Sequence, residues 1–171
     1  MANLCSYVMK IVSDKKENVD KVMNLLNETN MDKEYIGGRI DSSIYEYEKT
    51  KNGRYSVSVF GDCAWSIWGC LFGGEWTNDL NSMTIVQASK KFNLDVEIFS
   101  QEPAAGFAEH YLIKNGDVLI DDDVPYYEYP AYEYETKEAL EKDYGVSIPD
   151  EKWEGRDEWI SIGGYDEDFT I

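Results

Sequence analysis

Two runs of alternating side chains flank a turn in the stretch Arg39-Ile-Asp-Ser-Ser-Ile-Tyr-Glu-Tyr-Glu-Lys-Thr-Lys-Asn-Gly-Arg-Tyr-Ser-Val-Ser-Val-Phe60. In the second run Tyr55, Val57 and Val59 fall on one side, which is the period of a half-buried strand. Lys51-Asn-Gly53 lies between the runs, and Asn and Gly accept the positive φ that tight hairpin turns need. We therefore expect two antiparallel strands connected by this turn.

One strand and one helix precede this hairpin. Tyr7-Val-Met-Lys-Ile-Val12 is rich in β-branched residues and is typical of a strand. The spacing of Val19, Val22, Met23 and Leu26 then places four apolar side chains on one face of an amphipathic helix. The chain thus begins with a strand followed by a helix.

A second helix and a fourth strand follow the hairpin. Ser82 or Thr84 can open a helix that carries Ile85, Ala88 and Phe92 on one side, and residues 95–99 alternate as a strand. The order β-α-β-β-α-β is that of a split βαβ, ferredoxin-like domain, in which two helices cover one face of an antiparallel sheet. The sequence therefore predicts an α+β fold with a ferredoxin-like core at residues 1–120.

The remaining residues, 121–171, are expected to form an acidic, Tyr- and Trp-rich extension packed on this core. Asn115-Gly116 predicts an extra hairpin between two short strands at the junction. Residues 136–145 predict a short helix with Thr136 as N-cap and Gly145 as terminator, and residues 159–162 predict a last strand.

Three short stretches carry a resemblance to a known family. They are Met1-Ala-Asn-Leu-Cys5, Asp62-Cys-Ala-Trp-Ser66 and Glu102-Pro-Ala-Ala-Gly-Phe-Ala-Glu109. Their order and spacing are similar to those of the YubB-type ferredoxin-like proteins of phages and conjugative plasmids, over roughly residues 1–120. The resemblance implies a ferredoxin-like fold and a mobile-element origin. It implies no activity that can be assigned to particular residues.

The negative charge of the chain is concentrated in its second part. The formal net charge is −18; residues 1–100 carry 14 acidic and 11 basic side chains, whereas residues 101–171 carry 20 and 5. A surface of this kind repels nucleic acid and membranes and suits a basic protein partner. We find neither a signal peptide nor an apolar run of the roughly 20 residues that span a bilayer. Three cysteines indicate reduced thiols, so we expect a cytoplasmic protein of a bacterial host.

Catalytic and metal-binding motifs are not recognisable. His110 is the only histidine and could act as a base for Cys63 or Cys70, but no nucleophile signature surrounds either cysteine. These three residues could also ligate zinc, yet the paired short spacings of structural zinc sites are missing. The EF-hand spacing is missing after Asp121 and the Gly pairs fit no phosphate-binding loop. We therefore expect a protein that is not an enzyme and holds no metal or cofactor.

The leading functional hypothesis is a non-enzymatic accessory protein of a phage or plasmid that binds a basic host protein. That partner would be a nucleic-acid-binding defence factor, of the kind targeted by anti-CRISPR or anti-restriction inhibitors, with carboxylates standing in for phosphates. Tyrosines would add rigid contact area. The residues expected to bind it are Asp121, Asp122, Asp123, Tyr126, Tyr127, Glu128, Tyr129, Tyr132, Glu133, Tyr134 and Glu135.

Two alternatives stay open. The first is a small-ligand or nucleotide-binding domain, in which stacking aromatic rings and nearby carboxylates frame a pocket. Its expected lining is Trp65, Trp68, Trp76, Glu102, Phe107 and Glu109. The second alternative is a structural component of an oligomer, since the sequence leaves the oligomeric state undetermined.

Overall fold

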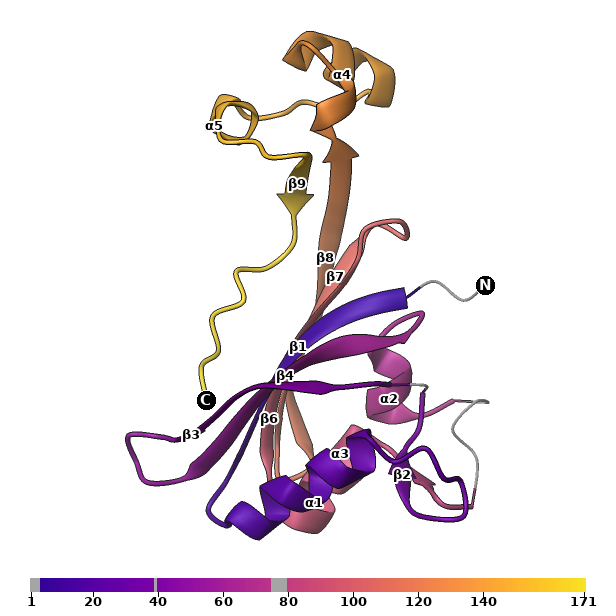
Figure 1. Ribbon diagram of the computed structural model, residues 1–171, viewed down its shortest axis with the longest axis vertical. Helices are drawn as coiled ribbons and strands as arrows, with labels where there is room; N and C mark the ends of the chain where they lie inside the picture. Colours follow the sequence, from indigo (N-terminus) through magenta and orange to yellow (C-terminus); the bar gives the residue numbers. More distant parts are fainter. Residues whose placement is uncertain (1–3, 39, 75–79) are drawn as a thin grey trace.

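A seven-stranded antiparallel sheet dominates the computed structural model, which describes residues 4–38, 40–74 and 80–171 (Figure 1). The strands lie in the order β3-β4-β1-β6-β7-β8-β9. Their bounds are Leu4–Ser13 (β1), Ser43–Lys49 (β3), Tyr55–Ala64 (β4), Asp95–Glu102 (β6), Phe107–Lys114 (β7), Asp117–Pro130 (β8) and Trp159–Gly163 (β9). The short strands β2 (Tyr35–Ile36) and β5 (Ser82–Met83) pair separately and in parallel.

Helices make up only about a quarter of the structure. They are α1 (Lys16–Leu26), α2 (Trp68–Phe72), α3 (Ile85–Phe92), α4 (Lys137–Tyr144), α5 (Asp150–Glu154) and a single 3-10 turn, Ala131–Glu133. Within the described ranges, none is long and apolar enough to cross a membrane.

The expectation of a small ferredoxin-like domain is wrong. The sheet has seven strands and curls into a half-barrel, whereas a ferredoxin-like sheet is small and its helices form a full layer. The reason is that strand pairing does not stop at residue 102. A tight turn joins β6 to β7, and the turn at Asn115-Gly116 joins β7 to β8. Each added strand forms hydrogen bonds along the unpaired edge of the strand before it. The 14 residues of β8 extend the sheet further, because their distal half pairs with β9.

Both predicted hairpin turns are confirmed. At the second turn, Asn115 and Gly116 have φ of +50° and +86°, the left-handed pair that a two-residue hairpin needs. The first turn is longer: β3 and β4 pair from Lys49 and Tyr55 outward, and Gly53 alone in this loop has positive φ, at +78°.

One face of the sheet, here called the helix face, carries the main core. Alternate residues Tyr7, Met9 and Ile11 of β1 lie beside Ile98 of β6 on this face, and α1, α2 and α3 cover them. The core includes apolar side chains at the predicted helical spacing, because α1 buries its apolar stripe against the strands. The opposite face carries the intervening residues, such as Val8, Phe99 and His110.

A second, smaller core lies beyond the main sheet. It forms where the distal half of β8 and β9 meet α4 and α5, at the end of the molecule opposite α1 and α3 (Figure 1). Its buried members are Tyr129, Ala131, Leu140, Ile148 and Ile160. Thr136 caps α4 by accepting a hydrogen bond from the Ala139 amide at 3.3 Å. The expected boundary between residues 120 and 121 falls inside β8, which belongs to both parts.

Candidate functional site

Three consecutive aspartates occupy the middle of β8, and all three are exposed. Cross-strand partners project to the same face of an antiparallel sheet. Asp121 and Asp123 are paired with Tyr111 and Glu109 of β7, so they lie on the helix face. Asp122 is paired with His110 and lies on the opposite face. The run of aspartates therefore divides its charge between two surfaces.

Two of the tyrosines expected to bind a partner are buried instead. Tyr126 is 6% exposed and donates a hydrogen bond to Glu128 Oε1 at 2.6 Å. Burial and this hydrogen bond raise the pKa of Tyr126 to about 12. The ring of Tyr129 packs edge-on against Tyr144, with 5.2 Å between centroids, in the second core. The Glu128 carboxylate is therefore occupied by the Tyr126 hydroxyl. The rings of Tyr126 and Tyr129 are buried and are not available to a partner.

The other members of the candidate run are more accessible. Tyr127 and Tyr132 are 45% and 60% exposed, and Glu133 and Glu135 are exposed. Tyr134 is half-buried and donates a hydrogen bond to Asp143, whose carboxylate raises the pKa of the tyrosine. These residues extend the exposed acidic and aromatic surface toward α4.

The tryptophan-rich segment after β4 stands on the helix face. Trp65 and Trp68 are 58% and 50% exposed. Trp65 has φ of +71°, a left-handed conformation that costs an L residue roughly 1–2 kcal/mol. Ser66 fixes this segment, because its hydroxyl accepts from the Trp68 amide at 3.0 Å and donates to Glu109 Oε1 at 2.7 Å. Trp76 lies outside the described residues.

Glu109, which the sequence suggested as part of a pocket wall, is buried. Its carboxylate accepts hydrogen bonds from Ser66 and Ser100, both at 2.7 Å, and from the Tyr111 hydroxyl at 3.2 Å. Glu102 is also buried and accepts from the Ala104 amide at 3.2 Å. These two carboxylates hold the end of the sheet together, and Phe107 packs against the main core.

The tryptophan segment and the aspartates of β8 meet around Tyr111. Trp68 contacts Phe72 with 5.6 Å between ring centroids, and Phe72 contacts Tyr111 at 5.9 Å. Burial raises the pKa of Tyr111, and the carboxylates of Glu109, Asp121 and Asp123 raise it further. We call this region the aromatic–acidic surface. Its exposed members are Trp65, Trp68, Asp121 and Asp123, and the partly buried Phe72 and the buried Tyr111 lie beneath them.

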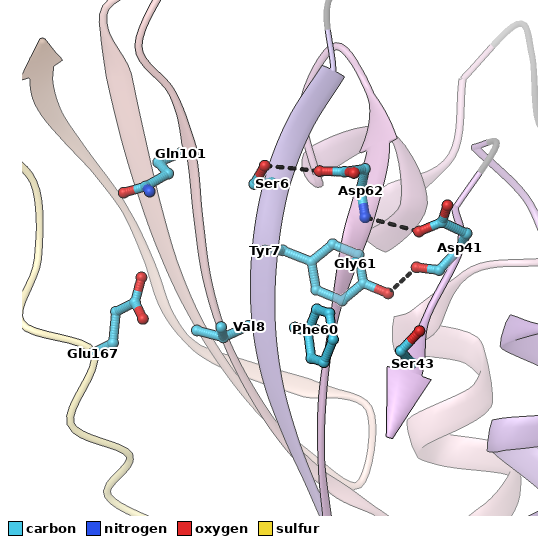
Figure 2. A pocket seen from close by; sticks show the side chains of 10 residues that line it. All are labelled: Ser6, Tyr7, Val8, Asp41, Ser43, Phe60, Gly61, Asp62, Gln101 and Glu167. Atoms are coloured by element: carbon cyan, nitrogen blue, oxygen red, sulfur yellow. Dashed lines mark hydrogen bonds between the residues drawn. The ribbon is translucent and has the colours of Figure 1, made fainter. Parts of the chain in front are cut away.

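A pocket of about 500 Å³ lies on the opposite face (Figure 2). Asp41 and Asp62 lie on one side of it and Glu167 on the other. The Ser6 hydroxyl donates to Asp62 Oδ1 at 2.7 Å, and the Asp62 amide donates to Asp41 Oδ1 at 2.9 Å. Glu167 is exposed on its solvent side, and partial desolvation of its carboxylate at the pocket raises its pKa. None of the ten lining residues is basic, so the pocket favours a cation over an anion.

Sequence reasoning missed this pocket. Its carboxylates come from the segment before β3, from β4 and from the region after β9, and no local spacing links positions so far apart. The expected pocket at the tryptophan segment and the observed pocket are therefore on different faces of the sheet.

The residues weighed for nucleophilic or zinc chemistry are separated by the sheet. Cys5, Cys63 and Cys70 are buried in the main core on the helix face. The hydrogen bond with Cys63 and burial raise the pKa of Cys5. For Cys63 the hydrogen bond with Cys5 lowers the pKa, but the hydrogen bond with Cys70 and burial together raise it above its usual value. His110 lies on the opposite face, with its Nε2 3.0 Å from Glu97 Oε1. In the part of the chain that the structure describes, no three His, Cys, Asp or Glu side chains are placed to hold a metal ion.

Comparisons with known protein families, with curated proteins and with solved structures find no match to this chain.

Proposed function

We propose that this chain is a non-enzymatic binding protein for a basic protein partner, which it engages through the aromatic–acidic surface and the exposed carboxylates that continue along β8. The observation that carries the proposal is the set of unneutralised carboxylates at Asp121, Asp122 and Asp123. Among the ion pairs between described residues, none includes a carboxylate from 117 to 135.

The exposed tryptophans support the same proposal. Trp65 and Trp68 lie on the face that Asp121 and Asp123 share, and tryptophan beside carboxylates is suited to arginine, whose guanidinium both stacks on rings and pairs with carboxylates. Charged groups at an interface contribute chiefly to association rate and specificity, whereas aromatic rings supply contact area. The aromatic–acidic surface combines charged groups with aromatic rings.

The kind of partner follows from the same chemistry. A protein that holds nucleic acid presents lysines and arginines to phosphates, and a surface of unpaired carboxylates competes for those groups. The resemblance to phage and plasmid proteins makes a nucleic-acid-binding defence factor of a bacterial host the partner to test first. This origin stays a prediction.

The test is affinity capture from a bacterial lysate by the immobilised chain, followed by quantitative binding of the captured protein. The triple variant Asp121→Lys, Asp122→Lys, Asp123→Lys should lose binding. The matched control Glu154→Lys, Asp157→Lys, Glu158→Lys changes the net charge equally but lies in and after α5, and it should retain binding.

Salt and DNA provide the two further readouts. Binding should weaken between low salt and about 0.15 M salt, because the screening length falls from about 30 Å at 0.01 M to about 8 Å. Double-stranded DNA should displace the chain from its partner. Equal loss of binding in both triple variants would mean that only net charge matters, and unchanged binding in the β8 variant would refute the proposal.

A further inference from the structure

Residues 164–171, here called the strap, cross the sheet on the face opposite the helices. After β9 the chain runs back along the sheet without regular secondary structure (Figure 1). Gly163 and Gly164 begin this path with φ of +83° and +82°. The Gly164 amide donates to the Pro125 carbonyl at 3.0 Å, which fixes the first end of the strap to β8.

The second end of the strap is held by a buried carboxylate. The side chain of Glu97 in β6 is fully buried, yet it accepts hydrogen bonds from the backbone amides of Thr170 at 2.6 Å and Ile171 at 3.2 Å. The Thr170 hydroxyl lies 3.1 Å from both carboxylate oxygens. His110 also contacts Glu97, with its Nε2 3.0 Å from Oε1. A buried carboxylate needs such partners, because desolvation without them is costly.

Aromatic rings of the strap pack between these two ends. Phe99 and His110 stack with 4.2 Å between centroids, and together they form a flat aromatic patch. Phe169 contacts Phe99 at 5.6 Å, and Tyr165 lies 6.1 Å from Phe99 and 5.5 Å from His110. The strap thus binds to the sheet as a peptide binds a groove, with two aromatic anchors and two backbone donors.

The backbone in the middle of the strap is weakly held. Among the hydrogen bonds of the described residues, no donor is a backbone amide from 165 to 169. Asp166, Glu167 and Asp168 are exposed and lie on the same side of the sheet as Asp122, so like charges oppose the seated position. Lys10 is the cross-strand neighbour of Glu97, but its ammonium pairs with Glu48 at 3.4 Å.

We propose that the strap is releasable: when seated it closes an aromatic groove formed by Phe99, His110 and Glu97, and when released it opens that groove to a peptide of the same chemistry. Such a peptide carries an aromatic side chain followed by backbone N–H groups free to donate to Glu97. Release would also remove the Glu167 wall of the pocket in Figure 2 and join pocket and groove.

The first experiment is amide hydrogen exchange by NMR on the full chain and on Glu97→Gln, which keeps the shape of the side chain but weakens its acceptors. The amides of Thr170 and Ile171 should exchange about tenfold faster in the variant, since both donate to Glu97 Oε2 and a Gln amide keeps one acceptor oxygen where the carboxyl group has two. Amides of β1 and β4 should not change. Glu109→Gln is the matched control, because it also alters a buried carboxylate but one that does not touch the strap.

The single histidine supplies a second readout on the groove. Phe169→Ala should shift the imidazole signals of His110 by removing an aromatic ring near its stack, and should leave the thermal midpoint of the main core unchanged. A synthetic peptide of residues 165–171, added in excess to this variant, should restore the shifts, whereas the same peptide with alanine at position 169 should not.

Three results would overturn the proposal. Strap amides that exchange as slowly as the sheet amides in the unaltered chain would make the segment a fixed part of the fold. Equal acceleration in Glu97→Gln and Glu109→Gln would make the effect global. Failure of the peptide to move the His110 signals would show that the groove does not accept a separate chain.

Discussion

Tyr126 and Tyr127 are neighbours in β8 with opposite environments. Tyr126 is buried and hydrogen-bonded to Glu128, whereas Tyr127 projects to the other side and is 45% exposed. Tyr127 lies over Gly106, where an added Cβ would come within 2.5 Å of its ring. The pleat of the strand alone decides which ring is structural and which is accessible.

The buried ring gives a prediction for alkaline pH. A folded-state pKa of about 12 for Tyr126, above the usual value of about 10, means that the folded chain favours the protonated hydroxyl. The stability from this group is therefore fully present below pH about 10 and is lost as the pH rises through about 12. Ultraviolet titration of phenolate absorbance should show a late-ionising tyrosine that is missing in Tyr126→Phe. Identical titration curves for the two proteins would contradict the assignment.

Among the elements, β8 connects the two parts of the molecule, because it pairs with both β7 and β9. Its first half completes the main sheet against β7, and its second half pairs with β9 over the second core. In the β8–β9 pair, Gly163 lies opposite Tyr126. The two backbones approach so closely here that a Cβ on Gly163 would lie 2.0 Å from the Pro125 carbonyl oxygen, and this restrains the register of the pair. Only glycine permits this approach.

Gly163→Ala should therefore destabilise the chain more than Gly53→Ala. Both glycines have φ near +80°, so both substitutions carry the roughly 1–2 kcal/mol cost of a left-handed alanine. Gly53 has open space around it, whereas the clash at Gly163 should add about 1–3 kcal/mol. Urea denaturation of the two variants measures the difference, and equal free energies of unfolding would show that the β8–β9 register is not restrained at this point.

At the scale of the whole molecule, the described residues form two apolar clusters that β8 connects. The main core lies between the helix face and its helices, and the second lies among β9, α4 and α5. The acidic surfaces lie along the strand that connects them. The charge therefore sits on a rigid ladder of backbone hydrogen bonds, where it can present a fixed pattern to a partner.

Leu140→Ala and Leu26→Ala test whether the two clusters are energetically separate. Both leucines are buried, one in the second core and one in the main core, so each substitution should cost about 2–5 kcal/mol. Hydrogen exchange should rise in α4 and β9 for the first variant while the amides of β1 and β4 keep their protection. Leu26→Ala should accelerate exchange in β1 and β4. Uniform acceleration in both variants would indicate a single cooperative unit.

Local patterns predicted the individual elements better than their assembly. The period of apolar side chains and the chemistry of turns act over a few residues. They predicted the strands around Val57 and Ile98, the helices at 16–26 and 85–92 and both Asn-Gly turns. The fold class was wrong because the number of strands in a sheet depends on edges that pair over long sequence distances. The candidate site was located only in part: Asp121 to Asp123 are exposed, but Tyr126, Tyr129 and Glu109 are buried.

The sequence by itself determined the segregation of negative charge, the aromatic content of residues 124–135 and the turns that reverse the chain, because composition and local backbone preference need no partner. Tertiary structure alone decided which face each carboxylate occupies, how Trp68 comes to share a surface with Asp121, and that Glu97 is buried under residues 164–171. Each of these depends on contacts between segments distant in the chain, and a linear pattern does not encode such contacts.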